Sequence, residues 1–247
     1  MIQLRANEDI HRTEGGWFSP RWHFSFGQYR DPEQMGFGAL RVFNDDRLIP
    51  GAVWPMHPHR DIEGITYVVE GTFEHADSLG NGGILLPGAV QRATLGSGME
   101  HSERNGSQGA PMRFLQFWIL PDAADLPPSI DQKQFSKEQR TDRLLRVVAP
   151  MEQAAPDAVG VHQDASVFVS HLTPGHRVAH ETADGRGVYL YLIDGRATLN
   201  GEPIRTGDAA KVFEGESIEI EARVPSELIL VDVPLRYEPV GVWARAR

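Results

Sequence analysis

Two short histidine couplets constrain this chain more than any other feature. The sequence HPH contains His57 and His59, and the sequence HSE contains His101 and Glu103. On a β-strand, residues i and i+2 point to the same face of the sheet. If two such strands face one point inside a small barrel, all four side chains converge there. Three imidazoles and one carboxylate form a ligand set for a single divalent metal ion.

The segments around both couplets have the pattern of short strands separated by tight turns. The stretch ITYVVEGTFEHADSLGNGGILLPGAVQRATLGSGMEHSE is interrupted by glycine turns at EG, LGNGG, LPG and LGSG. Similar runs continue in the second half, among them GVYLYLIDGRATLNG and SELILVDVP, and little room is left for long amphipathic helices. The pattern predicts an all-β protein. Short strands with inward-pointing ligands are the arrangement of a cupin barrel, the jelly-roll or double-stranded β-helix.

The two halves of the chain resemble each other, which predicts two cupin barrels, a bicupin. TYVVEGTFEH in the first half is similar to YLYLIDGRATLNG in the second. Alignment of the turn glycines Gly71 and Gly195 places Glu181 opposite His57, and the other three ligand positions have no metal-binding residue opposite them. We therefore predict a degenerate, metal-free second barrel that has a structural role or covers the first.

A stretch rich in proline and charge, LPDAADLPPSIDQKQFSKEQ, separates the two halves. We predict an N-terminal metal-binding cupin barrel over residues 1–125 and a connection over 126–144. Residues 145–247 are then the C-terminal degenerate barrel with its tail.

Composition narrows the class of protein. The chain has 247 residues and no cysteine, which excludes disulfides, thiolate metal ligands and iron–sulfur clusters. It carries 24 basic and 34 acidic residues, a net charge of −10, with no block of Lys or Arg, so we expect no direct nucleic-acid binding. It has no apolar run of membrane-spanning length, and its first residues lack a signal-peptide core. We expect a cytoplasmic protein with no membrane contact.

Glu63 is an alternative fourth ligand. Many cupins take that ligand from a glutamate shortly after the HxH pair, and Glu63 is four residues past His59, at the same strand parity. Periodicity therefore leaves both Glu63 and Glu103 open. Four residues could accept a hydrogen bond from a ligating imidazole: Asp61, Glu63, Glu100 and Gln116.

Two further groups of residues receive weaker interpretations. An aromatic run near the N-terminus is expected to be core or a barrel lid, and otherwise the wall of a ligand pocket: Trp17, Phe18, Trp22, Phe24 and Phe26. His75 is expected to be half-exposed on a strand, and His162 is assigned no function.

The sequence resembles the pirin family, bacterial members especially. The resemblance rests on HPHRDIEGITYVVEG, DSLGN and GMEHSE around the couplets, and on FGQYRDPEQMGFGALRVFNDD, FLQFWILPD, IDQKQF and VHQDASVF elsewhere. It extends over essentially the whole chain. It implies a bicupin whose N-terminal barrel binds metal through His57, His59, His101 and Glu103, and it favours Glu103 over Glu63.

The resemblance also implies a cofactor. The family binds iron, so Fe(II) is the first choice for one divalent metal per chain, although Ni, Co, Mn, Cu or Zn could occupy the same ligands. Four protein ligands on an octahedral ion leave two open positions, enough for an enolate and dioxygen together.

The activity implied by the resemblance is that of a quercetin 2,3-dioxygenase, which opens the ring of a flavonol with O2 and releases carbon monoxide. Glu103 would be the catalytic base that takes the proton of the substrate's 3-hydroxyl. The alternative is a metal-binding, redox-sensing or regulatory protein with incidental dioxygenase activity and a protein partner that the sequence does not identify. The family is known in both roles, and both need the same ligands.

Overall fold

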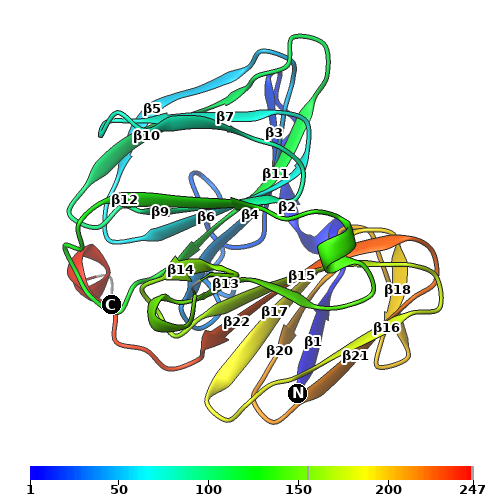
Figure 1. Ribbon diagram of the computed structural model, residues 1–247. Helices are drawn as coiled ribbons and strands as arrows, with labels where there is room; N and C mark the ends of the chain where they lie inside the picture. Colours follow the sequence, from blue (N-terminus) through cyan, green and yellow to red (C-terminus); the bar gives the residue numbers. More distant parts are fainter. Residues whose placement is uncertain (155, 246–247) are drawn as a thin grey trace.

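The computed structural model of the chain consists almost entirely of β-strands and describes residues 1–154 and 156–245. Its four sheets lie in four layers, with a four-stranded sheet outermost on each side and two seven-stranded sheets between them (Figure 1). The all-β class predicted from the turn-separated strands and the two barrels predicted from the similarity of the two halves are confirmed. The 3-10 helices of the described residues span at most the five residues Gly241–Arg245, and none of their helices is long and apolar enough to cross a membrane.

The N-terminal barrel pairs one seven-stranded sheet with one four-stranded sheet. The larger sheet has the order β12 (Ser129–Gln134), β9 (Ala89–Thr94), β6 (Glu63–Glu70), β11 (Met112–Ile119), β4 (Leu40–Leu48), β3 (Phe18–Trp22) and β2 (His11–Arg12). The smaller sheet has the order β5 (Val53–His59), β10 (Met99–Asn105), β7 (Phe73–Asp77) and β8 (Gly82–Leu85).

The C-terminal barrel repeats this arrangement. Its larger sheet has the order β1 (Ile2–Arg5), β20 (Ala209–Val212), β17 (Arg186–Asp194), β22 (Ser226–Pro234), β15 (Ser166–Leu172), β13 (Leu145–Pro150) and β14 (Val159–Val161). Its smaller sheet has the order β16 (Arg177–Glu181), β21 (Ser217–Ala222), β18 (Arg196–Leu199) and β19 (Glu202–Arg205).

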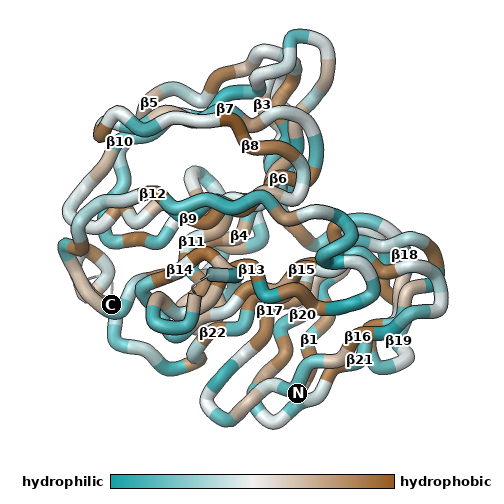
Figure 2. The backbone as a smooth tube through the Cα atoms, in the orientation of Figure 1, coloured by the Kyte–Doolittle hydropathy of each residue, from teal (hydrophilic) through white to brown (hydrophobic). Residues whose placement is uncertain are grey.

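A single apolar core joins the two barrels, because their seven-stranded sheets pack face to face. The N-terminal sheet contributes Phe43, Leu115 and Phe117, and the C-terminal sheet contributes Tyr189 and Val231, all at most 1% exposed. Figure 2 shows hydrophobic residues concentrated in these central strands. Burial of one such side chain stabilises the fold by about 1.5–3 kcal/mol, so this interface contributes heavily to stability.

Sheet membership differs from the expected boundaries in three places. β1 pairs with β20, so residues 2–5 complete the C-terminal barrel and not the N-terminal one. β12 pairs with β9, so residues 129–134 belong to the N-terminal barrel and not to the connection. The C-terminal tail returns to the N-terminal barrel, where Trp243 Nε1 donates a hydrogen bond to the Asp61 carbonyl at 2.8 Å. Each exchange covers an edge or surface that would otherwise be exposed.

A buried ion pair of the N-terminal sheet, between Asp45 on β4 and Arg113 on β11, bonds to the C-terminal barrel at the edge of this core. The Asp45 carboxylate receives hydrogen bonds from Arg113 Nε at 2.9 Å and Nη2 at 2.7 Å, and from the Tyr191 hydroxyl at 2.6 Å. Arg113 Nη1 also donates to Asp194 at 2.8 Å. Burial alone would raise the pKa of Asp45, but the hydrogen bonds and charge of Arg113 outweigh it and hold that pKa below its ordinary value.

Candidate metal centre

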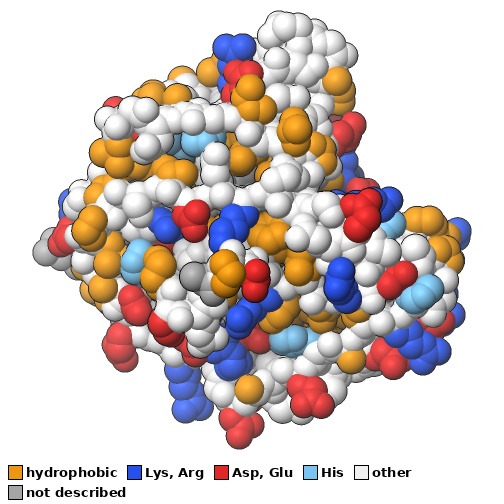
Figure 3. Space-filling model, viewed as in Figure 1, with side chains coloured by type: hydrophobic (Ala, Val, Ile, Leu, Met, Phe, Trp, Pro, Cys, Tyr) orange, Lys and Arg blue, Asp and Glu red, His pale blue; other side chains and the backbone are white. Residues whose placement is uncertain are grey.

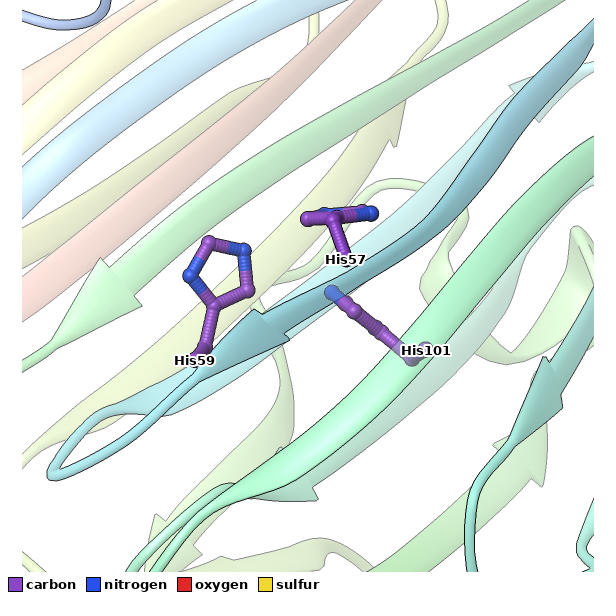
Figure 4. A group of neighbouring side chains, drawn as sticks. All are labelled: His57, His59 and His101. Atoms are coloured by element: carbon purple, nitrogen blue, oxygen red, sulfur yellow. The ribbon is translucent and has the colours of Figure 1, made fainter.

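Three imidazoles converge inside the N-terminal barrel, as the strand spacing predicts. β5 and β10 are antiparallel neighbours, with His101 directly opposite His57 and Met99 opposite His59. One ligand atom from each histidine lies within 4.8 Å of those of the other two. Figure 4 shows His57 and His59 rising from one strand toward His101 on the next. This spacing lets one ion contact all three rings.

Glu103 lies beside the three histidines, two residues after His101 on β10. A bulge between His101 and Glu103 shifts the register, so that Glu103 pairs with Trp54. The Glu103 side chain is buried, its Oε1 lies 3.8 Å from His101 Nδ1, and it accepts a hydrogen bond from Gln116 Nε2 at 2.7 Å. The mutual spacing of 4.8 Å holds for the histidines and does not extend to Glu103.

The protonation of these residues suits a cation. Burial, together with the charges of the neighbouring imidazoles, lowers the pKa of His59 to about 3 and that of His101 to about 4, so both rings are neutral at neutral pH. Burial raises the pKa of Glu103, against the charge of His57 and the hydrogen bond from Gln116.

The hydrogen bonds of the His57 and His101 imidazoles also suit metal binding. His57 Nδ1–H donates to the Pro55 carbonyl at 2.9 Å, which leaves its Nε2 lone pair free, and such a bond commonly orients a ligating imidazole. His101 Nε2 is buried without a partner among the described residues, a cost that a bound cation would remove. The donor set therefore fits a divalent metal ion.

Glu63 lies in a different part of the barrel. Asp61, with a φ of 52°, turns the chain between β5 and β6, and Glu63 begins a strand of the other sheet. Its carboxylate accepts hydrogen bonds from His162 Nδ1 at 3.3 Å and Thr94 Oγ1 at 3.1 Å, and lies 3.8 Å from Arg92 Nε. Strand parity does not continue through this turn, so Glu63 faces the interface between the barrels.

Of the other residues expected to bond to a ligating imidazole, Gln116 lies at the site, whereas Asp61 and Glu100 do not. Gln116 contacts the site through Glu103, as described above. Asp61 binds the backbone N–H of Asp125 and of Val242 in the tail, and Glu100 is exposed. The expectation that His75 is half-exposed is wrong: it is 9% exposed, and its Nε2 donates to Gln132 Oε1 at 3.1 Å.

A small cavity of about 60 Å³ lies between the imidazoles and the larger sheet. Its aromatic walls are Phe18, Phe26, Trp54 and Phe114. Two members of the N-terminal aromatic run thus form pocket wall, whereas Phe24 is fully buried core. The second barrel was predicted to have a structural role or to cover the first. It does not line this cavity, because every described residue that does so belongs to the N-terminal barrel.

Two lining residues were missed by sequence reasoning. Asn44 and Asp46 alternate along β4 and face the cavity, and Oδ1 of each is buried without a partner among the described residues. Burial and the charges of Asp45 and Glu103 raise the pKa of Asp46 well above its ordinary value. The available signal was a pair of polar residues at i, i+2 within the apolar run ALRVFNDDRLI.

The site also has an outer approach. An open depression of about 530 Å³ reaches His59 from outside the cavity and is bordered by Arg60, Met99 and Glu100. The Arg60 guanidinium lies against Asp125, at 2.6 Å between Nη2 and Oδ1, and so stays beside this opening.

The fold and the three converging histidines define a bicupin with a metal-binding site in its N-terminal barrel. The family model "Pirin" matches residues 4–119, and the model "Quercetinase C-terminal cupin domain" matches residues 147–233. The chain belongs to the pirin family, as its sequence motifs indicate.

Curated and solved relatives agree with this assignment. The chain is 37% identical over 236 residues to the quercetin 2,3-dioxygenase of Escherichia coli K12, covering 95% of this chain and 99% of that protein. It is 35% identical to a pirin-like protein of Caulobacter vibrioides, covering 94% and 99%. The crystal structure of the bacterial pirin YhhW from Escherichia coli in complex with nickel(II) matches with a TM-score of 0.88 at 35% identity, covering 97% and 100%.

Proposed function

We propose that this protein is a metal-dependent dioxygenase that opens the ring of a flavonol such as quercetin and releases carbon monoxide. The observation that carries the proposal is the convergence of three imidazoles beside a buried carboxylate, at a cavity with aromatic walls. The quercetin 2,3-dioxygenase named among the relatives, 37% identical over nearly the whole chain, supports the same chemistry.

The proposed cofactor is one divalent metal ion per chain, held by His57, His59 and His101 with Glu103 as fourth ligand. Fe(II) remains the first choice, and the nickel(II) complex of the Escherichia coli pirin is evidence that related sites accept other first-row metals. When bound, the ion supplies Lewis acidity and a common point of attachment for an enolate and dioxygen.

Glu103 is the proposed base. Its Oε1 lies 3.8 Å from His101 Nδ1, and its raised pKa brings it closer to the acidity of a phenolic hydroxyl than an exposed glutamate. Gln116 holds Oε1 through a 2.7 Å hydrogen bond, which leaves Oε2 to take the proton of the substrate's 3-hydroxyl.

The size of the cavity places a condition on substrate binding. Sites for organic ligands usually have about 300–1,000 Å³, whereas this cavity has about 60 Å³. Phe18, Phe26 and Trp54 are only half-buried, so their side chains can turn outward. We propose that this aromatic wall opens to admit a planar ring system and then packs on its faces.

The proposal is tested by anaerobic reconstitution with Fe(II), followed by addition of oxygen and quercetin. We expect decay of the flavonol absorbance with release of carbon monoxide, and no reaction of a flavone that lacks the 3-hydroxyl, because only the flavonol can ligate as an enolate. If the loaded protein consumes neither compound, or binds both equally, the redox-sensing or regulatory alternative takes precedence.

Glu103→Gln is expected to lower kcat at least about a hundredfold, because a glutamine can still ligate weakly but cannot accept the proton. Glu63→Gln is the matched control: it removes a buried carboxylate of the same barrel that lies away from the cavity, so turnover should change far less. Steady-state kinetics at equal metal content make the comparison. Equal losses, or a larger loss at Glu63, would contradict the assignment of Glu103.

A further inference from the structure

A second hollow lies at the edge of the larger N-terminal sheet, on the face of β3 and β4 opposite the cavity. It has a volume of about 430 Å³, and Arg12, Arg21 and Arg47 line it together with Ser19 and the turn at Gly15. These arginines come from three adjacent strands, β2, β3 and β4 (Figure 1). We call this site the arginine hollow.

The strand register brings like charges together in the arginine hollow. Arg12 lies directly opposite Arg21, and Arg47 lies next along this face, opposite Ser19 of β3. Like charges in directly opposite positions destabilise a sheet. Elsewhere the charges mix: on the face drawn in Figure 3, basic side chains lie among acidic ones, as expected for a chain with a net charge of −10.

The acidic groups nearby do not neutralise these arginines. Asp45 is the carboxylate opposite Arg21, at 3.7 Å, but its oxygens already accept hydrogen bonds from Arg113 and Tyr191. Within the part of the chain that the structure describes, the guanidinium groups of Arg12 and Arg47 make no hydrogen bond and no ion pair within 4 Å. Glu8, the acidic group whose charge interacts with that of Arg12, is itself hydrogen-bonded to Arg205. Glu14 also lies at the rim of the hollow. With it and Asp45, the lining has two negative side chains against three positive ones.

We propose that the arginine hollow is a binding site for a small phosphate-bearing molecule. Planar guanidinium groups bind phosphate oxygens through paired hydrogen bonds, and several oxygens of one tetrahedral group can serve arginines from three strands at once. A bound dianion would also relieve the repulsion within the Arg12–Arg21 pair. The hollow is larger than a phosphate ion, so we expect a phosphate monoester, whose organic part occupies the remaining space.

The site is independent of the metal centre in its residues and close to it in the fold. Ser19 and Arg21 face the hollow from β3, whereas Phe18 of the same strand lines the metal cavity. On β4, Arg47 faces the hollow and Asp46 faces the cavity. The proposal does not depend on the dioxygenase activity, and its test measures binding only.

The test is calorimetric titration of the full-length, metal-loaded protein at low ionic strength, where exposed charges are least screened. The titrants are inorganic phosphate, glycerol phosphate, citrate and, at matched ionic strength, chloride. We expect saturable binding of both phosphates, tighter for the ester. Citrate binding as tight as phosphate, or phosphate heats no larger than those of chloride, would overturn the proposal.

Variants locate the binding within the fold. Arg47→Ala should weaken phosphate binding at least about tenfold, Arg12→Ala/Arg47→Ala should abolish it, and Arg47→Lys should lie between, because lysine keeps the charge without the planar fork. Arg104→Ala is the matched control: this exposed arginine pairs with Glu74 outside the hollow and should bind as the wild type.

The shift in Tm that phosphate causes distinguishes a loss of binding from a loss of folding, because it is measured only on protein that is folded at the start. Phosphate should raise the Tm of the wild type and leave that of Arg12→Ala/Arg47→Ala unchanged. In chloride alone the double variant should be at least as stable as the wild type, because the like-charge pair Arg12–Arg21 is removed. A variant that keeps the full phosphate shift in Tm would show that the anion binds elsewhere, at the metal for example, and would refute the proposal.

Discussion

Replacement of His57 and His101 by alanine is expected to reduce the metal content from about one ion per chain to a small fraction of that value. Only one of the three converging imidazoles would remain, and a single neutral nitrogen holds a divalent ion weakly. Elemental analysis after dialysis against metal-free buffer measures the loss. Turnover of quercetin, if present in the wild type, should disappear with the metal.

His176→Ala is the matched control for this experiment. His176 is an exposed histidine of the C-terminal barrel, 3.6 Å from Asp142, and belongs to no group of described residues that could hold a metal. Its loss should leave the metal content unchanged. Full metal content in the His57→Ala/His101→Ala protein would mean that the metal lies elsewhere, and a fall in the control would point to the second barrel.

Replacement of Asp45 by alanine is expected to lower the free energy of unfolding by about 3–5 kcal/mol, because it leaves the Arg113 guanidinium buried without its main partner. The pair is almost fully buried, with side-chain exposures of 3% for Arg113 and 0% for Asp45, and it connects β4 to the C-terminal barrel. Urea unfolding followed by circular dichroism measures the change.

Two comparisons isolate the cause of this loss. Removal of both charges in Asp45→Leu/Arg113→Met should cost much less than Asp45→Ala alone, since no buried charge is left unpaired. Arg104→Ala, which breaks an exposed ion pair with Glu74, should cost less than about 1 kcal/mol. If Asp45→Ala is no more costly than Arg104→Ala, the buried pair does not hold the barrels together.

Local geometry explains what could be predicted for the metal centre. The alternation of side chains along a strand is a property of the backbone, so HPH and HSE specified that His57 and His59 share a face and that His101 lies on an equivalent face of another strand. The bulge after His101 was not visible in the sequence. It shifts Glu103 relative to β5, and the distance of Glu103 from the histidines depends on it.

The position of Glu63 shows why periodicity has a limited range. On an unbroken strand, Glu63 would share a face with His59. The chain turns at Asp61, however, and the next strand, β6, belongs to another sheet. For the same reason, the sequence did not show that Asn44 and Asp46 line the cavity. Their shared face follows from alternation, but which sheet that face meets is decided by the packing of β4.

The sequence by itself determined the all-β class, the repeat of two barrels and the three histidines of the first barrel. Each of these follows from spacing along a short segment or from composition. Only the tertiary structure decided that β1 and the tail each cross to the other barrel, that Asp45 and Arg113 lie between the barrels, and that three arginines meet at one sheet edge. These features depend on contacts between residues far apart in the chain, where the free energy of packing whole sheets outweighs any local preference.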